Sequence, residues 1–461
     1  MTSKIKKTAA LLLATALLAV SVAGCGSTPA ASSASASESA TPAASSASTE
    51  ASASASAEPE KPKEATVTYM DWEGKEMMGS IEKAVAKFTD VNPGLKVINI
   101  PAPLQDYGTK LQQMIAANAA PDVFRVGNDM AISYAASGLA YDITEYCKND
   151  AAFIGGFFPT SVETFQYNGK QVGLPSLLNC YGVFYNKKLF ADADVAEPKA
   201  GWSYDDMFAA ADKLKNADKG IFGMYGMGMD AFMLSQYTAS AGGKPFMDSF
   251  YPVSHVTMDP KMTEIITKIQ TAAKSGAIPP VGVDQGDIVA KFIAGEVPMM
   301  WYGQWVADQL IRTAPDLAWG FAPNPTQNAD NFHTILDATG FSISATTPHP
   351  DEAYMLLKYV VGTAYNDVLP EFPVAPAAYT DASKTYFEKL TSTGHGDLAE
   401  GLNVQLTAKN KLLVRFLDPW SGDANKFGAD WTSILDGSKP LTDLDAYAAN
   451  INDVIANATV R

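Results

Sequence analysis

The segment Met300–Trp305, MWYGQW, places three aromatic rings and one amide within six residues. An aromatic ring can cover a face of C–H bonds, and an amide can donate and accept hydrogen bonds at hydroxyl groups. A carbohydrate offers both an apolar face and a rim of hydroxyls, so this segment is a candidate sugar-binding wall. We therefore select Trp301, Gln304 and Trp305 as candidate ligand-binding residues. Since the two tryptophans are four residues apart, packing in a hydrophobic core is the alternative for both.

Polar and aromatic residues also follow two expected strands. The sequence DWEG (71–74) comes directly after a strand expected at Ala65–Met70, and Asn-Asp (128–129) follows a strand that begins near Asp122. In wound α/β sheets, ligands bind at the carboxyl ends of the strands. The alternatives are a charge effect at a helix start, packing of the indole within its own lobe, and a solvated loop after the second strand. The candidates added here are Trp72, Glu73, Asn128 and Asp129.

Strands and helices alternate in the part of the chain that must position these residues. Apolar residues alternate over Ala65–Met70 and Leu95–Ile100, which predicts two strands, and a helical pattern covers Glu76–Phe88 between them. A second helical pattern includes Tyr107 and Leu111, and a third strand opens after it. This alternation predicts a mainly parallel, wound sheet.

A second set of elements follows later in the chain. The segments YGVFY (181–185) and TGFSIS (339–344) have the composition of strands. Ser203 and Asp206 form a capping-box pattern that predicts a helix start, and Pro350 suits the first position of another helix. We therefore expect two α/β lobes, with the chain crossing between them more than once.

The N-terminus has the layout of a secretory signal. Three lysines lie within the first seven residues, and residues 8–24 carry no charge. A transmembrane anchor is the alternative, although the apolar run is at the lower length limit for spanning a bilayer. The sequence VAGC (22–25) resembles the lipobox of bacterial lipoproteins. This resemblance implies that residues 1–24 are a lipoprotein signal peptide and that Cys25 carries acyl chains such as palmitate.

The segment after this cysteine has a very restricted composition. Residues 26–64 contain only Gly, Ser, Thr, Pro, Ala, Glu and Lys. Such a segment can bury almost nothing, so it cannot offset the entropy lost on ordering. We therefore expect residues 25–64 to be a lipidated cysteine followed by a disordered Ser/Ala-rich tether, with an end-to-end distance of about 35 Å.

Composition and motifs argue against several classes of protein. The formal net charge of −16, which becomes −19 without the three lysines of the signal peptide, argues against nucleic-acid binding. Cys147 and Cys180 could pair or could remain two separate buried thiols. The four histidines stand in no HExxH or CxxC-like context, so we expect no metal site and no cofactor. The methionines of GMYGMGMDAF suit adaptable packing better than copper binding.

Eight short segments, taken in order, resemble one family. Together they are similar to the extracellular solute-binding proteins of ABC importers, family 1, the sugar-binding family similar to maltose-binding protein. The resemblance covers nearly all of residues 65–375 and rests on the order and spacing of the segments. The segments are NPGLKV (92–97), APDVF (120–124), SGLAYDITEY (137–146), NGKQVGLP (168–175), VFYNKKLF (183–190), GWSYDDMFAAADKL (201–214), FIAGEVPMMWYGQW (292–305) and TGFSISATTPHPDEAYMLLKYV (339–360).

The resemblance implies an α/β, two-lobed, periplasmic-binding-protein-like fold of type II, with three hinge crossings and a ligand cleft between the lobes. The N-terminal lobe would comprise residues 65–175 plus 322–372, and the C-terminal lobe residues 176–321 plus 373–461. The crossings are expected near Pro175-Ser176, Phe321–Pro325 and Glu371–Pro376.

The resemblance also implies roles for candidate residues. It places Trp305 at the family's sugar-stacking position and Asp129 where the family often has a hydroxyl-binding carboxylate. Further candidates adjoin the first crossing, flank the strand that leaves the second crossing, or form another wall of the cleft. A glycine in such a strand allows close backbone approach or marks a bulge. The candidates added on this basis are Asn179, Tyr181, Asp337, Gly340 and Trp420.

We therefore expect a binding protein without enzymatic activity. It would capture a mono- or oligosaccharide by hinge closure and deliver it to the transmembrane permease subunits of an ABC importer. The lipid on Cys25 would hold it at the extracellular face of the cell membrane of a single-membrane, Gram-positive bacterium. We expect a monomer, because the two lobes must move freely.

Two alternatives remain open at this point. The same fold could bind a polyamine, a peptide or a phosphorylated compound, and Arg125, near a cleft strand, weakens the neutral-sugar interpretation. An extracellular glycosidase is the second alternative, because a catalytic carboxylate pair cannot be recognised among fifty acidic residues. No GxSxG or HExxH sequence supports a hydrolase.

Overall fold

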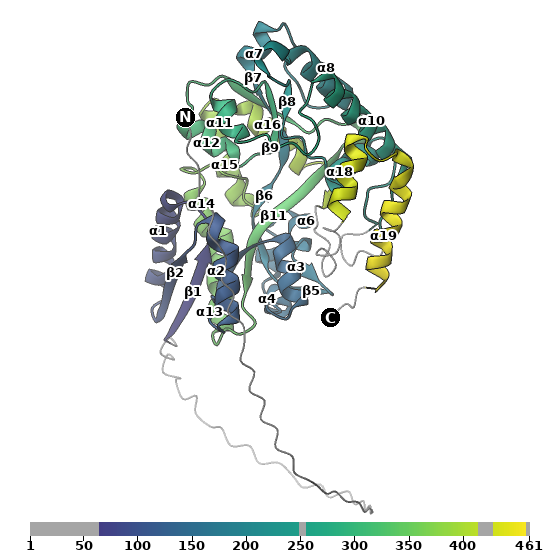
Figure 1. The fold of residues 1–461 in the computed structure, drawn as a ribbon. Coiled ribbons are helices and arrows are strands. Elements are labelled where there is room, and N and C mark those ends of the chain that lie inside the picture. Colours follow the sequence, from purple (N-terminus) through teal and green to yellow (C-terminus); the bar gives the residue numbers. More distant parts are fainter. Residues whose placement is uncertain (1–63, 249–254, 414–426, 458–461) are drawn as a thin grey trace, which may run out of the picture. The chain divides into compact units, whose positions relative to one another are not determined.

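The computed structural model describes residues 64–248, 255–413 and 427–457. Every helix and strand named below belongs to one unit, Lys61–Arg461. Its strands form two larger sheets and one short hairpin (Figure 1). The predicted signal peptide, Cys25, Trp420 and the tether up to residue 63 lie outside the described residues.

The first sheet includes the three strands that the N-terminal part of the sequence predicts, which are β1, β2 and β3. Its strands are β1 (Ala65–Asp71), β2 (Leu95–Pro101), β3 (Val123–Gly127), β6 (Leu174–Asn179), β11 (His333–Ile343) and β12 (Asn410–Leu413). The strand order is β12-β11-β3-β1-β2, with β6 paired to β11. β1 is parallel to both of its neighbours, β2 and β3, whereas β11 is antiparallel to β3 and β6. The carboxyl ends of β1 and β3 therefore meet at one edge of this sheet.

The second sheet is mainly antiparallel. Its strands are β7 (Tyr181–Asn186), β8 (Met224–Tyr225), β9 (Met299–Gly303) and β10 (Trp319–Pro323). Its order is β10-β7-β9-β8, and β7 is antiparallel to both β9 and β10, so only β8 and β9 are parallel. The prediction of a mainly parallel sheet came from the alternation in residues 65–124, where β1 is parallel to β2 and β3, and it does not extend to the second sheet. Strand–helix alternation predicts parallel pairing only where a helix joins two neighbouring strands of one sheet, and β7 instead enters directly from the first sheet.

The chain passes between the two sheets over very short distances. β6 ends at Asn179 in the first sheet, and β7 begins at Tyr181 in the second. The chain returns between β10 and β11, since β10 belongs to the second sheet and β11 to the first. These connections bring the edges of both sheets together. The lobe boundaries given above stay predictions.

Helices surround the two sheets (Figure 1). A short π-helical segment, Val360–Ala364, continues α13 into α14, and the hairpin consists of β4 (Gln166–Tyr167) and β5 (Lys170–Gln171). The helices are α1 (Lys75–Val91), α2 (Leu104–Ala116), α3 (Asn128–Ala136), α4 (Thr144–Asn149), α5 (Ala151–Ile154), α6 (Pro159–Glu163), α7 (Lys187–Asp192), α8 (Tyr204–Leu214), α9 (Ala231–Ser240), α10 (Pro260–Ser275), α11 (Ile288–Ile293), α12 (Val306–Thr313), α13 (Pro350–Tyr359), α14 (Tyr365–Val368), α15 (Thr380–Ser392), α16 (Gly396–Leu406), α18 (Gly428–Asp436) and α19 (Leu444–Asn457).

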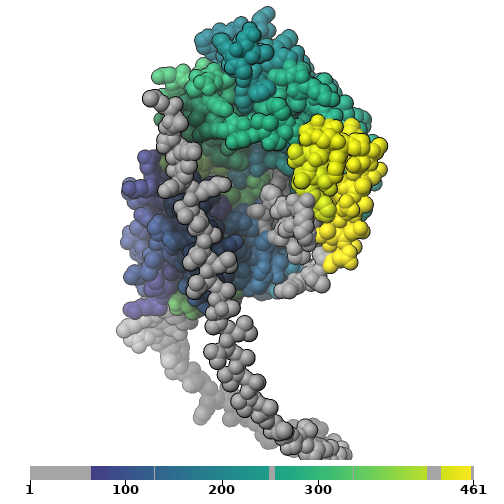
Figure 2. All heavy atoms as spheres, viewed as in Figure 1, coloured from purple at the N-terminus to yellow at the C-terminus, as the bar shows by residue number. Residues whose placement is uncertain are grey.

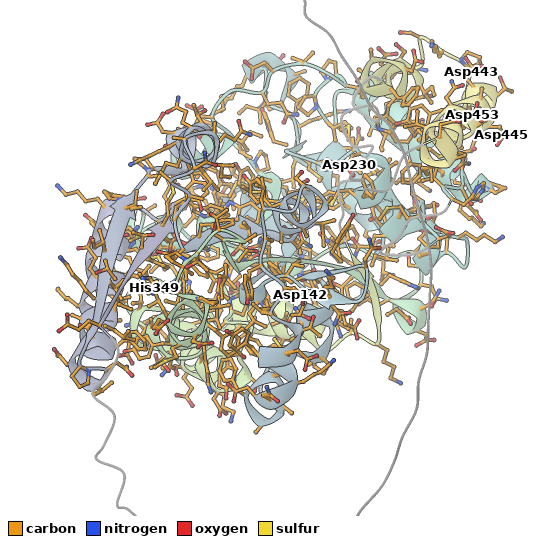
Figure 3. The ribbon with its side chains drawn as sticks, turned by 90° about the horizontal axis from the view of Figure 1, so that it is seen from below. Asp142, Asp230, His349, Asp443, Asp445 and Asp453 are labelled. Atoms are coloured by element: carbon orange, nitrogen blue, oxygen red, sulfur yellow. The ribbon has the colours of Figure 1, made fainter. Side chains whose placement is uncertain are left out.

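Several helix starts follow from local sequence. The predicted capping box is confirmed, because the Ser203 hydroxyl accepts a hydrogen bond from the Asp206 N–H and the Asp206 carboxylate accepts one from the Ser203 N–H. Pro350 is the first residue of α13, as predicted. Asp230, labelled in Figure 3, caps α9 by accepting from two backbone N–H groups. These caps satisfy N–H groups that would otherwise lack partners.

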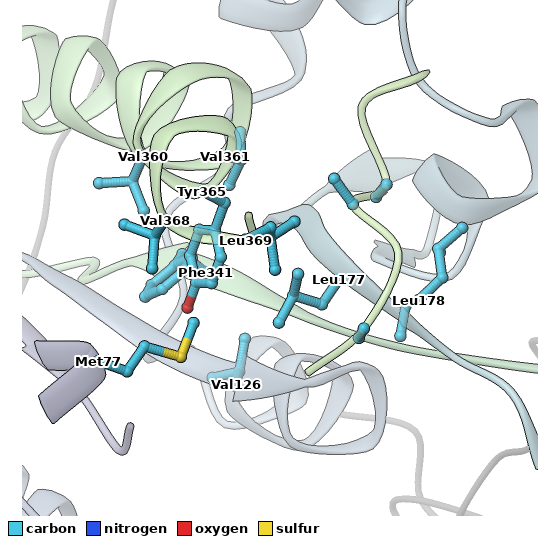
Figure 4. Close-up of a cluster of buried hydrophobic side chains, with 14 of the residues drawn as sticks. Met77, Val126, Leu177, Leu178, Phe341, Val360, Val361, Tyr365, Val368 and Leu369 are labelled. Carbon is cyan, nitrogen blue, oxygen red and sulfur yellow. The ribbon is translucent and has the colours of Figure 1, made fainter. Parts of the chain in front are cut away.

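Two hydrophobic cores hold the sheets and helices. The larger core contains β1, β3, α1, α13 and the π-helical segment, and Figure 4 shows Phe341, Tyr365 and Leu369 within it. The other core contains β8, α8, α10 and the C-terminal helices α18 and α19. In Figure 2 these C-terminal helices, in yellow, lie against the teal segment of the chain. Among the described residues, no helix has the length and apolar character needed to cross a membrane.

Candidate ligand-binding site

A cavity of about 480 Å³ opens where the two sheets approach each other. This volume lies within the range of small-molecule sites in proteins. The ends of β1 and β2 and the middle of β3 and β11 supply one wall, while the start of α12 supplies another. The residues that line the cavity are Trp72, Glu73, Gly74, Pro103, Leu104, Gln105, Arg125, Leu177, Asn179, Trp305, Thr339, Val374 and Ala375.

Two indole rings reach the cavity from different sheets. Trp72 follows β1 of the first sheet and packs edge-on against Tyr107, with 5.1 Å between ring centroids. Trp305 follows β9 of the second sheet and remains 37% exposed, which is unusual for so large an apolar side chain. A Cβ atom on Gly303 would lie 1.9 Å from Trp305 Cζ3, so the glycine leaves room for this ring. The arrangement offers two aromatic surfaces to a ligand.

A cluster of charged residues lies at the base of the cavity. Arg125 Nη1 lies 3.0 Å from Asp71 Oδ1 and 2.5 Å from Glu73 Oε1, and it also contacts the Tyr365 hydroxyl. Arg125 Nη2 donates to Thr339 Oγ1 at 3.1 Å. The arginine side chain is 2% exposed and Asp71 is fully buried, while Glu73 is 14% exposed. Glu73 is therefore the more exposed of the two charged residues that line the cavity.

The electrostatics of the cluster follow from its burial. Burial raises the pKa of Glu73, the nearby charge of Arg125 lowers it, and the net shift is upward. Burial alone would lower the pKa of Arg125, but Tyr365, Glu73 and Asp71 raise it well above its ordinary value. Burial likewise raises the pKa of Tyr365. Arg125 is thus a fixed cation, held by its carboxylate partners.

Three predicted residues meet beside the cavity. Asn179 Nδ2 donates to Asp337 Oδ2 at 3.2 Å, and the Tyr181 hydroxyl donates to the same oxygen at 3.3 Å. Asn179 and Asp337 are paired residues of the β6–β11 ladder. The Tyr181 ring lies edge-on to Trp305, with 5.6 Å between centroids. This group connects the two sheets at the crossing and places Asn179 in the cavity wall.

Other predicted residues lie away from the cavity wall. Trp301 is 2% exposed and packs in the core around α8 and α10. Gln304 is fully buried, accepts a hydrogen bond from the Cys180 N–H at 2.6 Å, and donates to the Leu178 carbonyl. Gly340 lies at an irregularity in the β6–β11 ladder, and a Cβ atom there would come within 2.1 Å of the Leu174 carbonyl oxygen. Trp301, Gln304 and Gly340 are therefore packed inside the protein, and none of them lines the cavity.

The structure describes the side chain of only one of the two candidate residues that follow β3. Asn128 is the first residue of α3 and is 2% exposed. Asp129 also belongs to α3, and its side chain lies outside the described part of the structure. Their role in ligand binding stays a prediction.

Several cavity residues were not selected from the sequence. Leu104, 61% exposed, begins α2 directly after β2, and the rule that ligands bind at carboxyl ends of parallel strands could have found it. A charged residue within the apolar sequence VFRVG was a signal for Arg125, whose partners are distant in the chain. Val374 and Ala375 lie on a loop after α14 and carry no distinctive sequence signal.

The cysteines and potential metal ligands add no chemistry to this site. Cys147 and Cys180 are unpaired thiols, and burial raises the pKa of Cys147 to about 11 and that of Cys180 to about 12. Within residues 64–248, 255–413 and 427–457, no group of His, Cys, Asp and Glu side chains could hold a metal ion.

The sequence matches the family of bacterial extracellular solute-binding proteins over residues 71–367, so the chain belongs to this family. Among its relatives, the multiple sugar-binding protein of Streptococcus mutans is 23% identical over 312 residues. That match covers 65% of this chain and 72% of the relative. The resemblance inferred from the eight sequence segments is confirmed.

Solved structures show the same fold. An ABC substrate-binding protein from Listeria monocytogenes, solved in complex with cycloalternan, superposes with a TM-score of 0.68 at 22% identity, covering 85% of this chain and 99% of that chain. The cyclic α-maltosyl-1,6-maltose binding protein of Arthrobacter globiformis gives a TM-score of 0.69 at 19% identity, with 86% and 100% of the two chains covered. The chain therefore has the two-lobed, periplasmic-binding-protein-like α/β fold that was predicted.

Proposed function

We propose that this solute-binding protein captures a mono- or oligosaccharide in the cavity and delivers it to the permease subunits of an ABC importer. The observation that carries the proposal is the pair of indoles, Trp72 and Trp305, supplied by different sheets and accompanied by polar groups. The Streptococcus relative is named a multiple sugar-binding protein, the Arthrobacter protein is named for binding cyclic α-maltosyl-1,6-maltose, and the Listeria protein was solved in complex with cycloalternan. These names and the bound cycloalternan support a carbohydrate ligand. No chemical conversion of the sugar is part of this function.

In the proposed mechanism, each indole covers one apolar face of a sugar ring. The free oxygen of Glu73 and the amide of Asn179 exchange hydrogen bonds with hydroxyls at the rim. A ligand that contacts both walls stabilises the closed arrangement of the lobes over the open one, and this difference in affinity drives hinge closure. The permease would then receive the closed, loaded protein.

The remaining predicted site residues are part of the proposal with different roles. Tyr181 and Asp337 would hold Asn179 and Trp305 in place, since they contact these residues. Gln304 would stabilise the crossing near Cys180, and Trp301 and Gly340 would keep the walls in position through packing. We retain Asn128, Asp129 and Trp420 as proposed ligand contacts.

We further propose that the protein is anchored to the extracellular face of the membrane of a Gram-positive bacterium. The lipobox-like sequence VAGC (22–25) and the polar tether up to residue 64 support this proposal. Lipid attached to Cys25 would provide more than one acyl chain, which stable anchoring requires. A monomer suits a mechanism in which the two lobes move relative to each other.

A thermal-shift screen of the purified protein against mono- and oligosaccharides, with polyamines and amino acids as controls, tests the proposal. A ligand at a hundred times its dissociation constant stabilises the native state by about 2.7 kcal/mol, which is visible as a raised Tm. A shift with a polyamine alone would keep the fold and overturn the carbohydrate assignment.

The best sugar from this screen then tests the role of Trp305. Trp305→Ala removes one of the two aromatic walls, so we expect an affinity loss of about tenfold, which corresponds to about 1.4 kcal/mol. Met355→Ala is the matched control, because Met355 is an apolar side chain of similar exposure, 42%, on α13 outside the cavity. Calorimetric titration that finds equal affinity in the wild type and in Trp305→Ala would contradict the stacking role.

A further inference from the structure

The charge of the cavity lining is set by two residues among those that the structure describes. Glu73 and Arg125 are its charged members, and the other lining side chains are uncharged. A buried arginine in a cavity is ordinarily a candidate receptor for a carboxylate or phosphate group, because its guanidinium can bind either in bidentate fashion. Whether Arg125 is free to act in this way decides which ligands the cavity accepts.

Both terminal nitrogens of the Arg125 guanidinium already have partners from its own chain, whereas its buried Nε has no hydrogen-bond partner among the described residues. Its Nη1 atom contacts Asp71, Glu73 and Tyr365, and its Nη2 atom donates to Thr339. The Trp72 ring covers the guanidinium, with 4.8 Å between the guanidinium carbon and the ring centroid. The Phe341 and Tyr365 rings lie 5.7 Å and 5.4 Å from the same carbon. An incoming anion that pairs with Nη1 would have to compete with Asp71 and Glu73, which already contact this atom.

Helix N-termini are the other features at this cavity that could attract an anion. The helices α1, α2 and α12 begin at lining residues, since Gly74, Pro103 and Trp305 are their N-cap residues. The N-terminus of a helix carries about half a positive charge, which favours negatively charged groups. Each of the three helices, however, has an acidic residue in its own first turn. These residues are Glu76, Asp106 and Asp308.

The protein's own carboxylates therefore offset every positive feature described at the cavity. In the buried group, two carboxylates, Asp71 and Glu73, face one guanidinium, which leaves a formal charge of −1 beside the ligand space. Because the group is buried, water and salt screen this charge less than at the surface. A negatively charged ligand would meet the net negative charge of this group at Glu73, its more exposed carboxylate.

We propose that the cavity selects uncharged sugars and amino sugars over uronic acids and sugar phosphates, and that Glu73 is the residue that sets this selectivity. The inference rests on the proposed carbohydrate function and adds the charge class of the ligand. One Glu73 oxygen is held by Arg125, so the carboxylate is fixed in position to accept hydrogen bonds from hydroxyl or ammonium groups. Arg125 acts through Glu73 as a positioning residue.

The experiment compares sugars that share one ring configuration and carry substituents of different charge. Glucose, glucosamine, glucuronate and glucose 6-phosphate form one series, galactose, galactosamine and galacturonate form a second, and the matching disaccharides extend both. We expect the full-length wild-type protein to be stabilised by neutral or amino members, with each acidic member shifting Tm less than its neutral parent. Stronger stabilisation by a uronate or phosphate than by its parent would overturn the inference and leave the carbohydrate proposal standing. A panel in which no sugar of any charge raises Tm would overturn both.

Two variants separate the charge of Glu73 from other effects. Glu73→Gln removes one negative charge, which changes the formal charge of the buried group from −1 to 0, and it keeps the size of the side chain. The affinity ratio of acidic to neutral sugar should therefore rise about tenfold. Glu145→Gln is the matched control, because Glu145 is 77% exposed, lies on α4 outside the cavity lining and should leave the ratio unchanged. An unchanged ratio in Glu73→Gln would overturn the assignment of selectivity to Glu73. If this variant does not fold, the wild-type panel alone decides the charge class.

Discussion

Two clusters of the same composition lie near the cavity in different environments. The buried cluster consists of Asp71, Glu73 and Arg125, and the rim cluster consists of Glu76, Asp308 and Arg312. Each has one arginine and two carboxylates. The arginine side chain is 2% exposed in the buried cluster and 39% exposed in the rim cluster. The two clusters therefore differ mainly in their access to water.

This difference shows that the number of ion pairs in a cluster does not predict how much the cluster stabilises the protein. In the rim cluster, water and salt can replace a lost partner at Glu76 and Arg312, while Asp308 is buried. Exposed pairs typically contribute 1 kcal/mol or less. In the buried cluster, removal of one partner leaves a charge that no solvent can compensate. We infer that the buried cluster fixes the cavity wall, whereas the rim cluster adds little to stability.

The largest effect is expected from Arg125→Met, which removes the cation of the buried cluster. Two carboxylates would then be left near each other in a buried site, so we expect the free energy of unfolding to fall by about 3–5 kcal/mol. Chemical denaturation measures this change. A loss similar to that of the equivalent change in the rim cluster, Arg312→Met, would contradict the distinction between the clusters.

Much of the fold was predictable from local sequence, but the buried cluster was not. Alternation and helical periodicity located β1, α1, β2, α2 and β3, because these elements repeat their pattern over adjacent residues. Arg125, in contrast, lies 54 residues from Asp71 and 240 residues from Tyr365. No local pattern records such pairings, since they arise only when the strands and the π-helical segment pack together.

The two tryptophans of MWYGQW illustrate the same limit at the candidate site. Their spacing of four residues is that of one helix face, yet Trp301 lies in β9 and Trp305 is the N-cap of α12. The strand ends at Gly303 between them, so the two rings point to different environments: one to a core and the other to the cavity. The sequence identified the segment, but the change of secondary structure within it decided which ring is available.

An intermediate effect is expected from Tyr365→Phe, which sharpens the comparison by removing only a hydroxyl from beside the buried cluster. This hydroxyl contacts Arg125 and donates to Asp71 Oδ2 at 3.2 Å. Loss of a buried hydrogen-bond partner should lower the free energy of unfolding by about 1–3 kcal/mol.

Tyr386→Phe is the matched control for this measurement. Tyr386 is also fully buried, and its hydroxyl has no hydrogen-bond partner among the described residues. We expect this variant to be as stable as the wild type or more stable, as judged by the same denaturation curves. If both tyrosine variants lose the same free energy of unfolding, the contact of the Tyr365 hydroxyl with the buried cluster does not contribute to stability.

The smallest effect is expected from Arg312→Met in the rim cluster. Arg312 donates to Asp308, 8% exposed, and to Glu76, 76% exposed, so part of its pairing faces water. We expect a loss of about 1 kcal/mol or less in the free energy of unfolding. Because salt screens exposed charges, this loss should shrink further between about 0.01 M and 1 M ionic strength. The effect of Arg125→Met should persist over the same range, since its partners are buried, and two equally salt-sensitive losses would mean that burial does not separate the clusters.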